Sequence, residues 1–219
     1  STWRGFEGWR PLKQEDRANY DWMHEMLYEV VIHSKAYANA EWRSATSWAP
    51  PTAAVIPAGG SATYGLRLIL SKDVESVSDA LLAAKVPVAV PLPATTLHAD
   101  MKDARLHLLT PKGLELTGSP ESDPPGCLEA TATSADAGLV KSLQLKPKSV
   151  GRCRLTLNYN VVERTLNGPR ELTQFVHYHI LEPAKTLLQR HGDFASSVGW
   201  LPANSSDPWH RGPGFMGTD

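Results

Sequence analysis

The feature that most constrains the fold is a series of short β-like segments in the middle of the chain. Turns rich in Gly, Pro, Ser and Asp separate these segments, which cover residues 104–109, 114–117, 127–133, 139–145, 152–159 and 173–180. Several short strands spaced in this way are typical of an all-β sandwich. We therefore predict a mainly β fold with a β-sandwich unit over residues 76–182.

The elements ahead of this unit are predicted from local patterns. Residues 26–33 are rich in β-branched and aromatic types and favour a strand, although a helical period fits them as well. A turn signal at 57–61, followed by alternating apolar residues over 62–70, predicts strand, turn and strand in an antiparallel sheet. Residues 74–84 place apolar side chains on one helical face and predict a short linker helix.

The chain changes character after the last predicted strand. Pro183 suits the first turn of a helix, apolar residues recur at helical spacing as far as Val198, and Gly199 ends the pattern. We predict that residues 200–219 form a loop. A single amphipathic helix after an all-β unit has nothing obvious to pack against, so we expect it to begin a helical domain.

These patterns predict three parts. Residues 1–75 belong to a large β-sandwich, residues 76–182 form the second sandwich, and residues 183–219 are a linker helix and loop leading toward a helical domain. Both ends of the chain look like cuts, so we expect a processed or trimmed piece of a larger protein.

Charge and hydropathy exclude two classes of protein. Lys and Arg number 22 against 23 Asp and Glu, which argues against nucleic-acid binding through a global basic field. The longest wholly apolar runs, such as residues 86–93, are too short to cross a bilayer. We therefore predict neither a nucleic-acid partner nor a membrane partner.

The two cysteines, Cys127 and Cys153, are compatible with two interpretations. They are separate buried thiols, or they form a disulfide between two strands of the middle unit. Neither belongs to a C-x-x-C pair, so zinc is not indicated. Asn204-Ser205-Ser206 is a glycosylation sequon, which matters only in a secreted protein.

The seven tryptophans avoid the middle of the chain, with none between residues 49 and 199. They contribute to two aromatic-polar clusters, one over residues 207–211 and one over residues 37–48. Trp offers a flat apolar face to sugar C–H groups, while Asp and Arg hydrogen-bond sugar hydroxyls. Our candidate substrate-binding residues are therefore Asp207, Trp209, His210, Arg211 and Trp42. The alternatives are a loop-anchoring Asp-Pro turn for the first cluster, and core or domain-interface packing for the second, which contains Tyr37, Glu41, Trp42 and Trp48.

Three histidines suggest a metal site only weakly. His177 and His179 alternate on a predicted strand and share one side, and His191 follows on the next helix. No acidic residue is spaced to complete a ligand set, so we predict neither a metal nor another cofactor.

Stretches spread over most of the chain carry a resemblance to a known group of proteins. They are His33-Ser34-Lys35-Ala36-Tyr37-Ala38 with Glu41-Trp42, residues 56–67, Gly151-Arg152 leading to Leu155-Thr156-Leu157-Asn158-Tyr159, residues 187–194 and residues 207–215. On these residues the chain resembles the front part of the six-hairpin glycosidase-like proteins. In these secreted carbohydrate-active enzymes a galactose-mutarotase-like β-sandwich precedes an (α/α) toroid. More closely, it resembles an uncharacterised fungal and bacterial secreted family within that group.

The resemblance implies an architecture and a function. The chain would contain the end of a large sandwich, an Ig-like sandwich and the start of a helical toroid. It would form the β-sandwich portion of an extracellular glycoside hydrolase acting on poly- or oligosaccharide. In such enzymes the acids usually come from loops of the toroid, beyond Asp219, so we predict no catalytic residue here. The implied partners are carbohydrate and a C-terminal helical domain or chain.

Two other functions stay open. One is a non-catalytic carbohydrate-binding or structural sandwich module, marked by a row of exposed aromatic residues on one sheet face. The absence of Trp from the middle unit argues against this module. The other is a domain for protein–protein contact.

Overall fold

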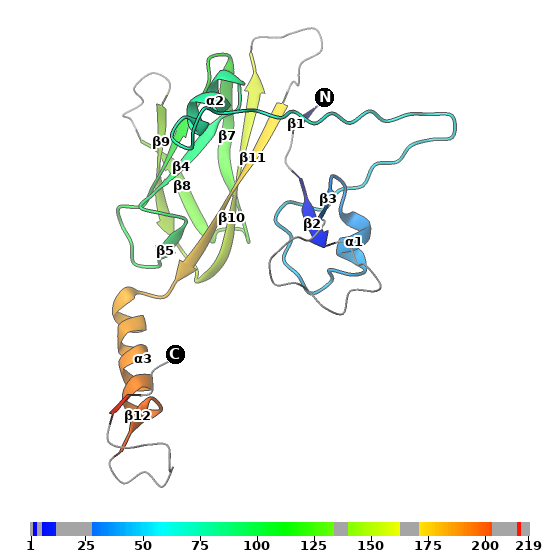
Figure 1. Cartoon of the computed structure of the whole chain (residues 1–219). Coiled ribbons are helices and arrows are strands. Elements are labelled where there is room, and N and C mark those ends of the chain that lie inside the picture. Colours follow the sequence, from blue (N-terminus) through cyan, green and yellow to red (C-terminus); the bar gives the residue numbers. More distant parts are fainter. Residues whose placement is uncertain are drawn as a thin grey trace.

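The computed structural model describes residues 2–3, 6–11, 28–133, 140–162, 171–202 and 214–215. Within these residues the chain is mainly β, as predicted. Two sheets pack into a sandwich, a smaller unit of strands and helix precedes them, and a helix follows them (Figure 1).

The first sheet of the sandwich has five strands. Three long strands, β7 (Leu114–Asp123), β10 (Gly151–Val161) and β11 (Glu171–Leu181), are antiparallel neighbours with β10 in the centre. Two short strands, β1 (Thr2–Trp3) and β5 (Thr96–His98), run parallel to β11. The N-terminus therefore adds a strand to a sheet that the sequence assigned to the middle of the chain.

The second sheet has four antiparallel strands. Their order is β4 (Val88–Leu92), β6 (Arg105–Leu109), β9 (Val140–Pro147) and β8 (Leu128–Ala132). The predicted segments from 104 to 180 thus all contain strands, several of them longer than predicted. An Asn-Gly pair is typical of a hairpin turn, and Asn167-Gly168, for which the sequence predicts such a turn ahead of β11, lies outside the described residues.

Alternation along each strand forms the core between the sheets. In β10, Cys153, Leu155, Leu157 and Tyr159 are at most 1% exposed, while the residues between them lie on the outer face. The second sheet contributes buried leucines at alternate positions, namely Leu106, Leu108, Leu143 and Leu145. Successive side chains of a strand point to opposite faces, so this period of two buries one face of each sheet against the other.

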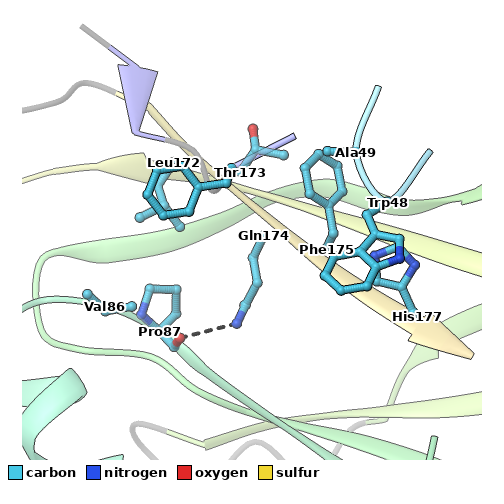
Figure 2. A pocket seen from close by; sticks show the side chains of 10 residues that line it. Trp48, Ala49, Val86, Pro87, Leu172, Thr173, Gln174, Phe175 and His177 are labelled. Carbon is cyan, nitrogen blue, oxygen red and sulfur yellow. Dashed lines mark hydrogen bonds between the residues drawn. The ribbon is translucent and has the colours of Figure 1, made fainter. Parts of the chain in front are cut away.

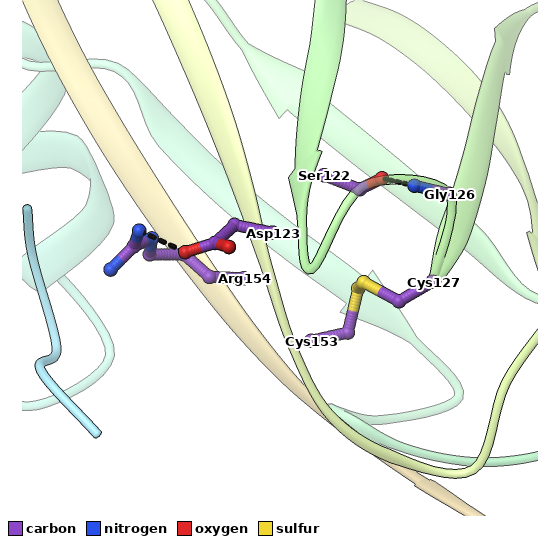
Figure 3. The surroundings of a disulfide bond; sticks show 6 residues. All are labelled: Ser122, Asp123, Gly126, Cys127, Cys153 and Arg154. Atoms are coloured by element: carbon purple, nitrogen blue, oxygen red, sulfur yellow. Dashed lines mark hydrogen bonds and ion pairs between the residues drawn. A yellow bond between two sulfur atoms is a disulfide. The ribbon is translucent and has the colours of Figure 1, made fainter. Parts of the chain in front are cut away.

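A disulfide between Cys127 and Cys153 ties the two sheets together (Figure 3). Cys127 directly precedes β8 in one sheet, and Cys153 lies on β10 in the other. Of the two interpretations, the disulfide is therefore correct and separate thiols are wrong. Closing a loop over a sequence separation of 26 restricts the unfolded chain and stabilises the fold by about 3.5 kcal/mol.

The N-terminal unit contains a two-stranded antiparallel sheet of β2 (Gly8–Pro11) and β3 (Tyr28–Val31), followed by α1 (Lys35–Asn39). The strand predicted over 26–33 is confirmed by β3. A sheet of two strands is marginally stable on its own. The unit is therefore held mainly by other contacts, which are described with the site.

Both strands predicted around the 57–61 turn, the one before it and the one over residues 62–70, are wrong. Residues 53–72, which we call the arm, run out from the N-terminal unit, turn and return to the sandwich without pairing (Figure 1). The turn itself is confirmed, because Gly59 has φ +74° and the Gly60 amide donates to the Pro57 carbonyl at 2.9 Å. An alternating pattern makes a strand only where a neighbouring strand accepts its backbone hydrogen bonds, and the described chain offers none here.

Both predicted helices are confirmed. The linker helix α2 spans Val77–Ala83, and the C-terminal helix α3 spans Ala184–Ser197. The apolar face of α3 stays largely open, with Leu188 73% and Phe194 59% exposed. None of the described helices is long and apolar enough to cross a membrane.

The prediction of loop throughout residues 200–219 is wrong at one place. Strand β12 (Trp200–Leu201) pairs antiparallel with β13 (Gly214–Phe215). Three of these four residues are large and apolar, and such residues are favoured in paired strands. The domain boundaries near residues 75 and 183 stay predictions.

Candidate functional site

Four of the five candidate substrate-binding residues, Asp207, Trp209, His210 and Arg211, lie outside the described residues. The fifth, Trp42, follows α1, and its ring is already packed. Tyr37 stacks on it with centroids 5.1 Å apart and planes 28° apart. A Cβ added to Gly8 would lie 2.9 Å from Trp42 Cζ3, so only glycine allows this approach of β2. Trp42 therefore offers little free ring surface for a ligand.

Trp48 is the most exposed tryptophan among those whose side chains the structure describes. Its side chain is 56% exposed, and it lines two cavities at once. The larger cavity has a volume of about 400 Å³, and the smaller one about 240 Å³. Trp42 and Glu7 line the smaller cavity together with Trp48. We take the surroundings of Trp48 as the candidate site.

The larger cavity lies between the 48–49 loop, residues 86–87 and strand β11 (Figure 2). Its walls include three aromatic side chains, Phe6, Trp48 and Phe175. Gln174 is a polar residue of the cavity wall. Its Nε2 donates to the Pro87 carbonyl at 3.2 Å, and its Oε1 accepts from the Tyr159 hydroxyl at 3.0 Å. A concave, mostly apolar site with a few fixed polar groups is typical of small-ligand binding.

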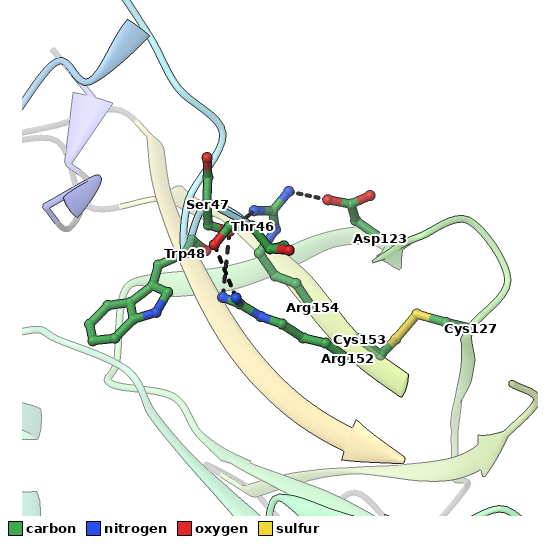
Figure 4. A network of polar contacts seen from close by, with 8 residues as sticks. All are labelled: Thr46, Ser47, Trp48, Asp123, Cys127, Arg152, Cys153 and Arg154. Atoms are coloured by element: carbon green, nitrogen blue, oxygen red, sulfur yellow. Dashed lines mark hydrogen bonds and ion pairs between the residues drawn. A yellow bond between two sulfur atoms is a disulfide. The ribbon is translucent and has the colours of Figure 1, made fainter. Parts of the chain in front are cut away.

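Two arginines of β10 hold the loop that carries Trp48 (Figure 4). Arg152 donates to the Thr46 carbonyl at 3.0 Å and to the Ser47 carbonyl at 3.5 Å. Arg154 donates to the Ser47 and Trp48 carbonyls at 3.2 and 3.3 Å. Both side chains project from the outer face of β10, because Arg152 and Arg154 flank Cys153, whose side chain points into the core.

Arg154 has further partners that fix its direction. It pairs with the carboxylate of Asp123 at the end of β7, and its guanidinium carbon lies 5.6 Å from the ring centroid of Phe175. Strand β10, which carries Cys153 of the disulfide, thus also positions Trp48 through Arg154. The Arg154 guanidinium is fixed by hydrogen bonds to backbone carbonyls, an ion pair and a contact with an aromatic ring. This i, i+2 pair of arginines was visible in the sequence, but its target loop, about one hundred residues away, was not.

His177 lies on β11 beside Arg154 and lines the larger cavity. Burial lowers its pKa from the ordinary value, and the positive charges of Arg152, Arg154 and His179 lower it further. Its Nδ1 is buried and has no hydrogen-bond partner among the described residues. His177 therefore stays neutral at physiological pH. Over the described ranges, no three His, Cys, Asp or Glu side chains gather in a metal-binding cluster.

Glu7 is the buried carboxylate of the smaller cavity, with only 3% of its surface exposed. Ser34 donates to it from its amide at 2.7 Å and its hydroxyl at 2.9 Å, and Thr52 donates from its amide at 2.9 Å and from its hydroxyl. Burial alone would raise the pKa of Glu7, but these four hydrogen bonds outweigh it and lower the pKa. Glu7 is thus a fixed anion that joins three segments and is unsuited to donating a proton.

A histidine extends this network toward the arm. His33 Nδ1 lies 2.8 Å from the Thr52 hydroxyl, and its Nε2 lies 2.9 Å from the Tyr64 hydroxyl. The single hydroxyl proton of Thr52 goes to Glu7, so His33 must donate from Nδ1. In neutral His33 the Nε2 then accepts from Tyr64. Nothing in the sequence singled out Glu7, because an isolated acid in an irregular segment carries no pattern.

The fold and the cavities define a mainly β protein with an aromatic cavity at the junction of its N-terminal unit and its sandwich. The chain belongs to DUF5695, a family of unknown function, whose model matches residues 2–219. No curated protein and no solved structure matches the chain.

Proposed function

We propose that the chain is the β-sandwich portion of a secreted carbohydrate-active enzyme, a glycoside hydrolase that acts on poly- or oligosaccharide. Within it, the larger cavity beside Trp48 contributes a sugar contact. The observation that carries this proposal is the open indole of Trp48, which is 56% exposed beside a cavity of about 400 Å³.

Trp48 suits a sugar ring for two reasons. Its indole presents a flat apolar face on which the C–H groups of a pyranose can stack. Its backbone is held at two consecutive carbonyls by arginines, so little freedom is lost when a ligand binds. His177 is neutral, and its Nδ1 in the cavity wall has no hydrogen-bond partner among the described residues, so it is a polar group to test for contact with a sugar hydroxyl.

The catalytic carboxylates are proposed to lie elsewhere. Glycoside hydrolysis needs two carboxyl groups facing the scissile bond, one of which donates a proton. Among the described residues that line the two cavities, Glu7, in the smaller one, is the one carboxylate, and its hydrogen bonds keep it ionised. The open apolar face of α3 supports packing against a helical domain that would supply the acids. Asp207, Trp209, His210 and Arg211 stay proposed sugar contacts, whereas the packed ring of Trp42 leaves little surface for one.

The disulfide supports an extracellular location. Such bonds persist in oxidising compartments and are rare in the reducing cytosol. The Cys127–Cys153 bond joins the two sheets in the core, where it contributes to the fold rather than to exchange chemistry.

Glycan binding by the chain tests the proposal directly. We expect binding on a glycan array, and Trp48→Ala to weaken it at least tenfold. Phe194→Ala on α3, which removes a similarly exposed aromatic ring, serves as the matched control and should leave binding unchanged. If no glycan binds, or if Trp48→Ala and Phe194→Ala behave alike, the sugar contact at Trp48 is wrong.

A non-catalytic binding module is the second candidate, because Glu7, the one carboxylate among the described residues that line the two cavities, is held in structural hydrogen bonds. Hydrolysis separates the two candidates. The full-length protein, incubated with the glycans that the chain binds, should release reducing sugar if it is a hydrolase. Binding without release would favour the module.

A further inference from the structure

The arm exposes apolar side chains to an unusual extent for a structured segment. Leu66, Leu68 and Leu70 are 71%, 85% and 94% exposed, and Val55 on the outgoing leg is 91% exposed. Within the described residues, no backbone hydrogen bond joins residues 61–72 to another segment. An extended segment with open N–H and C=O groups and alternating leucines is a template for pairing with another strand.

Two side-chain contacts hold the part of the arm that returns to the sandwich, residues 61–72. The Tyr64 hydroxyl bonds His33 Nε2 at 2.9 Å, and Arg67 Nη1 donates to the Ala84 carbonyl at 2.8 Å. These contacts fix this part at one point toward the N-terminal unit and at another toward α2. Residues 64–67 are therefore held in place before a partner binds, which reduces the entropy lost when a strand pairs with them.

We propose that residues 62–70 pair antiparallel with the same residues of a second copy of this chain, about a two-fold axis at Leu66. In that register Leu66 faces Leu66, Tyr64 faces Leu68 and Ala62 faces Leu70. One face of the ribbon is then apolar along its whole length. Such a contact is isologous, since the same patch serves on both copies.

The side-chain pattern of residues 62–70 is self-complementary in this register, which favours a copy of the same chain, and the charge of Arg67 selects the register. Arg67 is the one charged residue in 53–71, so the strand offers no charge pattern to a charged partner. With the axis at Leu66, Arg67 lies opposite Gly65. An axis one residue later would place Arg67 opposite Arg67, and like charges directly opposite each other are destabilising.

The size of the contact predicts a weak dimer. Nine residues rise about 30 Å and cover a strip about 10 Å wide, which gives roughly 600 Å² over both copies. This area lies below the roughly 1,200 Å² at which stable interfaces begin. We therefore expect self-association that depends on concentration, with dissociation on dilution.

A cysteine at the axis tests the pairing. Leu66→Cys places two thiols on directly opposed residues, and mild oxidation should link two chains covalently. Leu70→Cys is the matched control, because in this register its copies lie about 26 Å apart. Equal cross-linking of both variants, or none at Leu66→Cys, would overturn the proposed register.

Sedimentation equilibrium over a range of protein concentrations tests the interaction itself. The unmodified chain should pass from monomer to dimer, and Leu68→Asp should stay monomeric with an unchanged circular dichroism spectrum. A chain that stays monomeric at every concentration overturns the proposal. A longer form of the protein that is monomeric yet protects residues 62–70 from protease would assign the arm to another segment of the same polypeptide.

Discussion

Strand β10 and residues 62–70 of the arm both place apolar side chains at alternate positions, yet their surroundings differ completely. Leu155 and Leu157 of β10 are fully buried, whereas Leu66 and Leu68 of the arm are mostly exposed. The difference lies in their neighbours, because β10 pairs with β7 on one side and β11 on the other. Alternation specifies which face a strand would bury, but pairing decides whether the strand forms.

The disulfide that anchors β10, for which the arm has no counterpart, gives the largest expected effect on stability. Replacing Cys127 and Cys153 by Ala should lower the free energy of unfolding of the sandwich by about 3.5 kcal/mol, since the unfolded chain regains the freedom of the closed loop. Urea denaturation followed by circular dichroism measures this. A loss under about 1 kcal/mol would mean that the unfolded chain is little restricted by the bond.

Two leucines, one in β10 and one in the arm, test the comparison with the same residue type in both regions. Leu157→Ala should cost about 3 kcal/mol, because it removes fully buried methyl groups and leaves a cavity. Leu68→Ala, at 85% exposure, should change the unfolding free energy of the dilute monomer by less than about 0.5 kcal/mol. Comparable losses for both leucines would show that the arm is packed in solution.

The sandwich could be predicted from the sequence, and the reasons are visible in single strands. Residues 152–159 carry an unbroken period of two, and Gly and Pro mark the turns around them. The pairing of Cys127 with Cys153 could not be predicted, because spacing does not reveal which strands lie face to face. The same pattern misled at residues 62–70, where the missing information was the absence of a partner strand among the described residues.

The candidate site was harder to predict than the fold. The cluster over residues 37–48 was visible, but the sequence cannot show that Trp42 is covered by Tyr37 while Trp48 stays open. Nor does it show that Arg152 and Arg154 reach the carbonyls of residues 46–48. These are contacts between distant segments, which only the folded chain brings together.

The N-terminal unit depends on a carboxylate where the sandwich depends on leucines. Glu7→Gln should destabilise this unit by about 2 kcal/mol, because amide hydrogen bonds replace charge-assisted ones and the amide NH₂ meets donors. Hydrogen exchange at the Ser34 and Thr52 amides measures the loss. Unchanged protection of these two amides in the variant would mean that Glu7 does not hold the unit together.

The lowered pKa of Glu7 gives this contribution a pH dependence. Its ordinary value is 4.5, and the folded value is lower. The stabilisation is therefore complete above about pH 4.5 and is lost as the pH falls through the folded pKa, where the folded carboxylate takes up a proton. Protection that is independent of pH in this range would contradict the assignment.

His177, in the cavity between the N-terminal unit and the sandwich, gives the smallest expected effect on stability. Burial and the charges of Arg152, Arg154 and His179 lower its pKa below the ordinary 6.5, so below about pH 6.5 the unfolded chain binds a proton that the folded chain resists. The unfolding free energy should therefore decrease as the pH falls through this range, by at most about 1.4 kcal/mol per pH unit.

Substitution separates His177 from the other titrating groups. His177→Asn should flatten the part of the pH dependence that begins near pH 6.5, whereas His191→Asn, on the exposed surface of α3, removes no buried imidazole and should leave it in place. Urea midpoints between pH 5 and pH 8 provide the measurement. Identical slopes in the wild type and His177→Asn would show that the imidazole takes up its proton equally well in the folded chain. The cavity that His177 shares with Trp48 and Phe175 would then be more accessible to water than the structure indicates.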